Sequence, residues 1–120
     1  MHYTKCDRMG MRITIRNRNG AVMVSFHTMR ERFDSEYERN KFFRELHGWE
    51  QVVPQASKRY VYRRPGLLDE VPHIKVADSV FVVAAKNMQR MQEFFEQWED
   101  KVHAEMMEVI MEREKMRKLL

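Results

Sequence analysis

Two groups of side chains in this sequence have types and spacings that could do chemistry, and the first is acidic. Asp69 and Glu70 precede His73, and Asp78 follows. Carboxylates beside a histidine can move protons or bind a divalent cation. A polar loop in which an aspartate caps a short helix explains the same residues. We favour that simpler interpretation.

No other motif indicates a reaction. The chain lacks a P-loop, a dinucleotide-binding glycine loop, H-E-x-x-H and C-x-x-C. Its five histidines show no ligand spacing on one helix face, and Cys6 is the only cysteine. We therefore predict a protein that is not an enzyme, with no catalytic residue, no metal and no cofactor. The cysteine content, the absence of a long apolar run and the polar first ten residues favour a cytoplasmic location without membrane or secretory segments.

The second group is basic and aromatic, and it centres on SKRYVYRRPG at 57–66. Residues 1–66 hold 14 Lys or Arg against 7 Asp or Glu, a net charge of +7, whereas residues 67–120 hold 8 against 11, a net charge of −3. Such a separation of sign favours a polyanionic partner for the basic half. Scattered charge that only aids solubility would give the same totals.

We predict that three basic segments form one surface that binds structured RNA, chiefly through phosphates. Ribosomal RNA is one candidate target, suggested by the size and charge of the chain. Tyr60 and Tyr62 could stack on unpaired bases, although we expect at least one of them to lie in the core. The predicted nucleic-acid-binding residues are Arg12, Arg16, Arg18, Arg39, Lys41, Arg44, Lys58, Arg59, Tyr60, Tyr62, Arg63 and Arg64.

Two further functions stay open from the sequence. In a DNA-binding regulator, residues 57–66 would act as a wing beside a helix, although a complete helix-turn-helix is not visible. In a protein–protein adaptor, the methionine-rich C-terminal region would dock in a groove of a partner.

The elements that position these residues follow from periodicity and turn signals. Residues 11–28 alternate apolar and polar around Asn19-Gly20, which predicts a hairpin. A capping box at Ser35 and Glu38 predicts a helix over 35–47 that ends at Gly48. Strands are expected at 51–53 and 59–64, and the apolar run 80–85 predicts a central strand.

From about Asn87 to Leu120, apolar residues recur at three- and four-residue steps, which predicts one long helix. At 1.5 Å per residue such a helix would be about 50 Å long and would project beyond the domain. A second copy would cover its exposed stripe, so we predict a homodimer. The predicted interface residues are Phe95, Trp98, Val102, Met106, Val109 and Ile110.

The predicted fold class is α+β. A small antiparallel sheet, made of the N-terminal hairpin and two to three further strands, would pack with one short helix and one long C-terminal helix. We predict a flexible N-terminus at 1–10, a basic α+β domain at 11–104 and the projecting helix end at 105–120.

The run RYVYRRPGLLDEVPHIKVADSVFVV at 59–83 resembles a stretch of small uncharacterised archaeal proteins. In those proteins a basic-aromatic strand leads through a similar loop into a hydrophobic strand. The resemblance covers about a fifth of the chain. It implies an intracellular housekeeping or regulatory protein and assigns no residue a role.

Overall fold

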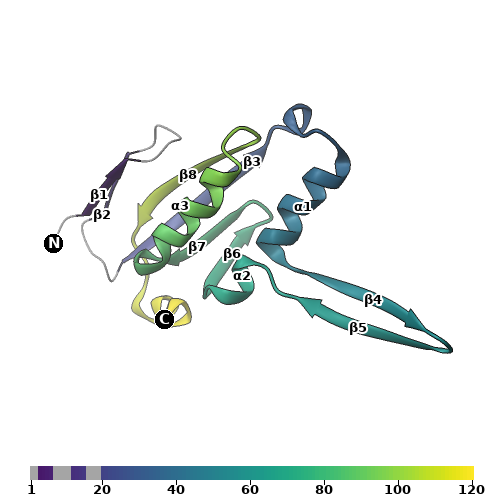
Figure 1. Cartoon of the computed structure of the whole chain (residues 1–120). Coiled ribbons are helices and arrows are strands. Elements are labelled where there is room, and N and C mark those ends of the chain that lie inside the picture. The colour runs from purple at the N-terminus through teal and green to yellow at the C-terminus, as the bar shows by residue number, and fades with distance from the viewer. Residues whose placement is uncertain (1–2, 7–11, 16–19) are drawn as a thin grey trace. The chain divides into compact units, whose positions relative to one another are not determined.

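A computed structural model describes residues 3–6, 12–15 and 20–120, with side chains described from residue 20 onward (Figure 1). The described chain divides into two units: Phe33–Val71 is one, and the segments on either side of it form the other. None of the helices in the described residues has the length and apolar content needed to cross a lipid bilayer.

The larger unit is built on a four-stranded antiparallel sheet with the strand order β6-β7-β3-β8. These strands span β3 Ala21–Thr28, β6 His73–Ala77, β7 Val80–Ala84 and β8 Val102–Val109. Helix α3, Met88–Gln97, lies across one face of the sheet (Figure 1). Short helical turns complete this unit: η1 Arg30–Arg32, η2 Ala85–Asn87, α4 Arg113–Met116 and η3 Arg117–Leu119.

The core of this unit lies between the sheet and α3. Val24 of β3 pairs with Phe81 of β7 and with Met106 of β8, so all three share the face that α3 covers. Phe26, on the same face of β3, packs against Phe95 of α3 with ring centroids 5.5 Å apart. On the opposite face, Leu119 is buried in a cluster of Ala21, Val82 and Ala84. Both faces of β7 are thus covered, which confirms the central strand predicted at 80–85.

The smaller unit contains α1 Glu36–His47, β4 Trp49–Gln55, β5 Lys58–Arg64 and α2 Leu67–Glu70. Helix α1 begins as the sequence predicts, because Ser35 Oγ accepts a hydrogen bond from the Glu38 amide at 3.2 Å. It ends at Gly48, which has a φ of 77°. Strands β4 and β5 form a separate two-stranded antiparallel ribbon from Trp49↔Arg64 to Gln55↔Lys58.

The α+β class is confirmed, but the predicted arrangement of its elements is wrong. No long C-terminal helix exists within the described residues 87–120; the longest described helix is α1, with 12 residues in mid-chain. Helix α3 ends at Gln97, a turn follows, and Val102–Val109 is strand β8. Strand β8 pairs with β3 over its full length, and this pairing outweighs the helical spacing of its apolar side chains.

The loss of the long helix removes the basis of the predicted dimer interface. Phe95, Val102 and Met106 are buried inside the larger unit, so these side chains are not available to a second copy. Trp98 and Val109 are half-buried, and Ile110 is fully exposed just after β8. The 105–120 segment is a strand followed by short helical turns rather than a projecting rod.

The predicted N-terminal hairpin is also paired differently. Strand β2, Arg12–Ile15, pairs with β1, Tyr3–Cys6, where no structure was expected. Strand β3 pairs with β7 and β8 instead. The Asn19 half of the predicted turn lies outside the described residues.

Candidate nucleic-acid interface

The two-stranded ribbon of β4 and β5, residues 49–64, extends from the C-terminal end of α1, and we call it the arm (Figure 1). Its two strands are joined by a tight turn at Ala56 and Ser57, and each is seven residues long. At about 3.4 Å per residue the ribbon is roughly 24 Å long. Pro54 fits here because, in an isolated pair of strands, its missing N–H can face outward.

The register of the arm sorts its side chains onto two faces. Gln51 lies opposite Tyr62 and Val53 lies opposite Tyr60, so these side chains share one face. We call this the aromatic face. It consists of Trp49, Gln51, Val53 and Gln55 on β4 with Lys58, Tyr60, Tyr62 and Arg64 on β5.

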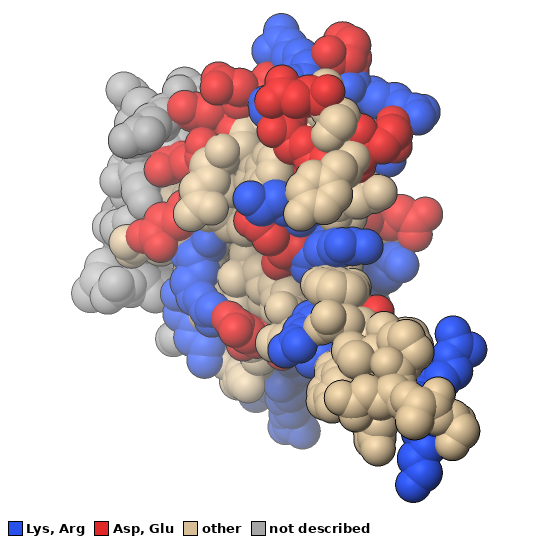
Figure 2. All heavy atoms as spheres, turned by 45° about the vertical axis from the view of Figure 1, so that its right-hand side comes forward, with Lys and Arg blue, Asp and Glu red and all other residues tan. Residues whose placement is uncertain are grey.

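The aromatic face is open to solvent and carries no acidic side chain. Tyr60 is 41% exposed and Tyr62 is 48% exposed, so the expectation that one of them lies in the core is wrong. The single acidic residue of the arm, Glu50, lies opposite Arg63 on the other face. Figure 2 shows the arm at the lower right, with blue Lys and Arg atoms and no red Asp or Glu atoms at its outer end. A cationic, aromatic strip of this kind has the composition that binds single-stranded nucleic acid.

Contacts within the arm fix the inner end of this face, near Trp49. Arg64 Nε donates a hydrogen bond to Gln51 Oε1 at 2.8 Å, and the Arg64 guanidinium lies 5.8 Å from the centre of the Tyr62 ring. These contacts hold the side chain of Arg64 along the face without cancelling its charge. Lys58 and Arg59, near the turn, have no ion pair within the described residues.

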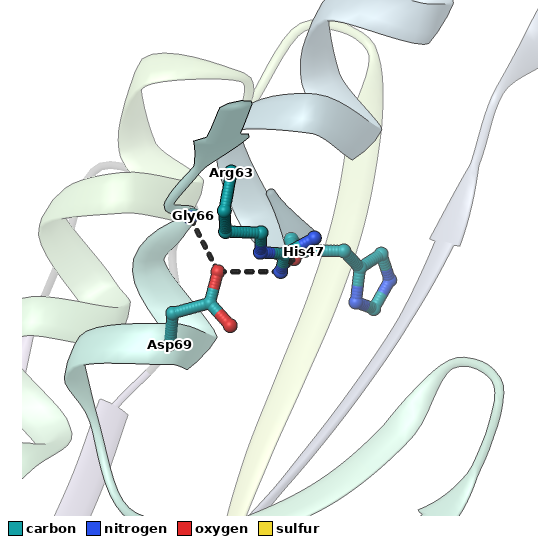
Figure 3. A network of polar contacts seen from close by, with 4 residues as sticks. All are labelled: His47, Arg63, Gly66 and Asp69. Carbon is teal, nitrogen blue, oxygen red and sulfur yellow. Dashed lines mark hydrogen bonds and ion pairs between the residues drawn. The ribbon is translucent and has the colours of Figure 1, made fainter. Parts of the chain in front are cut away.

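Arg63 has a different role, shown in Figure 3. Its guanidinium lies 2.7 Å from Asp69 Oδ2 and donates to the His47 carbonyl oxygen at 2.8 Å. The same carboxylate oxygen accepts a hydrogen bond from the Gly66 amide at 2.8 Å. This network joins the end of α1, the end of β5 and the start of α2. Arg63 therefore has a structural role in this unit, and because its side chain is 51% exposed, its contribution to nucleic-acid binding stays a prediction.

The aromatic face leads back to helix α1 through Trp49. The Arg44 guanidinium lies 4.4 Å from the centre of the Trp49 ring, a cation–π contact. Lys41 lies one turn earlier on α1, and both cations line the same hollow as Trp49. Two of the three basic segments predicted to converge, α1 and β5, are thus joined in one unit.

Of the remaining predicted residues, the structure describes the side chains of Arg39 and Arg59, and both lie away from the aromatic face. Arg39 lies over the Phe43 ring at 5.0 Å, and its Nε atom is buried. Arg59 lies on the opposite face of the arm from Tyr60 and Tyr62. The side chain of Arg12, and all of Arg16 and Arg18, lie outside the described residues.

Two carboxylates of the acidic group considered first form ion pairs with basic side chains. Asp69 is engaged by Arg63 and the Gly66 amide, and Asp78 lies 3.2 Å from Lys75 Nζ on the surface. In the part of the chain that the structure describes, no three His, Cys, Asp or Glu side chains are placed to hold a metal ion.

The sequence-based prediction did not include Trp49 and Gln51 in the candidate interface. Trp49 and Gln51 join it because β4 pairs with β5, which brings them beside Arg64 and Tyr62. The predicted strand at 51–53 already contains Gln51, and extending it by one alternation toward the N-terminus would have added Trp49. Comparisons with protein-family models, curated proteins and solved structures each found no match to this chain.

Proposed function

We propose that this protein binds unpaired segments of structured RNA through the arm and has no enzymatic activity of its own. The observation that supports the proposal is the aromatic face, where Lys58, Tyr60, Tyr62 and Arg64 form an exposed row with no acidic neighbour. Stacking of a base on an aromatic side chain is worth about 1–3 kcal/mol, and each cation adds a counterion-release contribution.

The geometry favours single strands over a duplex. A two-stranded ribbon can enter the major groove of DNA, so duplex binding is the second candidate. However, bases in a duplex are stacked on each other and cannot stack on Tyr60 or Tyr62. Duplex binding would therefore leave both tyrosine rings without a stacking partner. Unpaired bases use both the rings and the cations of the aromatic face.

The direct test is a salt titration of binding between the full chain and a short unstructured RNA labelled with a fluorophore. Affinity should fall steeply from about 50 to 200 mM salt. Replacing Lys58→Gln together with Arg64→Gln, the two cations of the aromatic face, should weaken binding and make the log–log salt slope shallower by about 1.4, because single strands give about 0.7 per phosphate contact.

A matched control removes the same charge elsewhere. Lys115→Gln together with Lys118→Gln changes two exposed residues near the C-terminus and should leave the slope unchanged. Equal effects of the two double variants would mean that net charge alone drives binding. A salt-independent or absent RNA signal would refute the proposal, and tighter binding of a duplex DNA competitor would favour the second candidate.

A further inference from the structure

The face of the arm opposite the aromatic face carries an exposed apolar pair, and we call it the valine face. Its three cross-strand pairs are Glu50 with Arg63 at the inner end, Val52 with Val61 in the middle, and Pro54 with Arg59 near the turn. Val52 is 46% exposed and Val61 is 59% exposed. A two-stranded ribbon is at best marginally stable in water until a further element packs on it. A partner on the valine face would therefore stabilise the arm as well as bury the two valines.

Opposite charges stand at the two ends of the valine face. Glu50 and Arg59 are exposed and have no ion pair within the described residues, whereas Arg63 is already held by Asp69. Glu50 and Arg59 are separated by four residue positions along the ribbon, or about 14 Å. The valine pair lies between them, so they do not pair within one arm. Each of them is therefore available to a charge on another molecule.

The edges of the arm oppose association through its strands. A second copy paired along β5 about Val61 would place all four cations of that strand opposite cations of the other copy, beginning with Arg59 opposite Arg63. Like charges directly opposite each other destabilise a sheet. On the other edge, Pro54 lacks the N–H that a neighbouring strand would need. Charged side chains and proline are the usual means of preventing such pairing, which leaves the valine face as the surface for contact.

We infer that the valine faces of two copies of this chain pack on each other, with the two arms running in opposite directions. A two-fold axis then passes between the paired valines, and the packed ribbons lie about 10 Å apart. The axis places the inner end of each face over the outer end of the other. Glu50 of each copy comes within reach of Arg59 of the other copy, so the same ion pair forms twice. The valine face is thus complementary to itself, which selects a second copy as its occupant.

The size of the face predicts a transient contact. A ribbon about 24 Å long and about 10 Å wide gives roughly 500 Å² of buried surface for the two copies together, whereas stable complexes bury about 1,200 Å² or more. The dimer should therefore form only at high protein concentration. Both aromatic faces point away from the contact, so the inference does not depend on the RNA-binding function proposed above.

The test measures self-association of the full chain without RNA, by sedimentation from about 0.05 to 1 mM protein, the range that suits a weak contact. The average mass should rise with concentration toward that of a dimer. Glu50→Arg and Arg59→Glu should each weaken association by at least about tenfold, because each places like charges together at both ends of the contact. Glu114→Arg makes the same change of charge on an exposed residue of the larger unit and should leave association unchanged.

Mixing the two single variants tests the pairing itself. Neither Glu50→Arg nor Arg59→Glu should associate alone, but an equimolar mixture should associate about as tightly as the unmodified chain. Each variant supplies the charge that the other has lost, and this rescue requires contact between two copies. An unmodified chain that stays monomeric throughout, or single variants that associate as well as the unmodified chain, would overturn the inference. A mixture that stays monomeric would overturn it as well.

Discussion

At the scale of single residues, two glycines allow the smaller unit to close. Gly48 has a φ of 77° and a ψ of 178°, a region of backbone conformation that only glycine populates readily. A Cβ at this position would lie 2.5 Å from Asp69 Oδ2 and 2.7 Å from the Arg64 carbonyl oxygen. At Gly66 a Cβ would overlap the backbone of Gly48. The end of α1 and the turn after β5 therefore meet through two residues without side chains.

We predict that Gly48→Ala lowers the free energy of unfolding by about 1–3 kcal/mol, because the new Cβ meets both an unfavourable φ and the Arg63–Asp69 pair. Gly48→Asn should cost a similar amount, since asparagine tolerates the left-handed helical region but not a ψ near 180°. Urea denaturation of both variants measures this. If Gly48→Asn were as stable as the unmodified chain, the backbone at this position would not need glycine.

At the scale of elements, the sequence predicts correctly the helix and the strand whose limits are set by neighbouring residues. The helix over 35–47 has its own capping box, and the strand over 59–64 has a clear alternation and a proline-glycine end. Strand β8 was missed because Val102 and Met106 fit both a helical step of four and a strand step of two. Its pairing with β3, 74 or more residues earlier in the chain, is a non-local interaction that periodicity cannot reveal.

Ala104 distinguishes the predicted helix from the observed strand at Val102–Val109. In a helix it would lie on the opposite side from Val102 and Met106 and would tolerate a charge. In strand β8 it lies between them on the buried face and is 2% exposed. We predict that Ala104→Lys lowers the free energy of unfolding by more than about 2 kcal/mol, because it buries an unpaired charge. Glu105→Lys, on the exposed face, should change stability by less than about 0.5 kcal/mol. Similar thermal melts for both variants would contradict the strand.

The residues of the candidate site were also predictable where they belong to one strand, and not where the fold brings distant residues together. Tyr60, Tyr62, Lys58 and Arg64 were predicted because they belong to one strand, and the structure places them on one exposed face. The structural role of Arg63 depends on Asp69 and on the backbone at His47, which the sequence does not bring together.

At the scale of the whole molecule, the larger unit depends on the end of the chain. Leu119 is fully buried against Ala21, Val82 and Ala84, and Met111 and Met116 pack around the same cluster. The C-terminal turns therefore cover the face of the sheet opposite α3, at one end of that face. The periodicity of this segment had predicted instead a projecting helix that pairs two copies.

We predict that Leu119→Ala lowers the free energy of unfolding by about 2–4 kcal/mol, as expected for removing a buried leucine side chain. Leu120→Ala is the matched control, because Leu120 is 70% exposed and its truncation should cost less than about 0.5 kcal/mol. RNA binding by the folded fraction of Leu119→Ala should be unchanged, since the arm belongs to the other unit. A stable Leu119→Ala variant would show that the C-terminal turns do not cover the sheet in solution.

The proposed RNA-binding residues all lie in the smaller unit, and the most direct measurement is to locate the bound RNA. Backbone amide signals of the full chain can be followed by NMR while a short unstructured RNA is added. The account predicts that the largest shifts fall on the arm and the adjoining turn of α1, led by Trp49, Lys58, Tyr60 and Tyr62. Shifts confined to strands β3, β6, β7 and β8, with the arm unchanged, would contradict it.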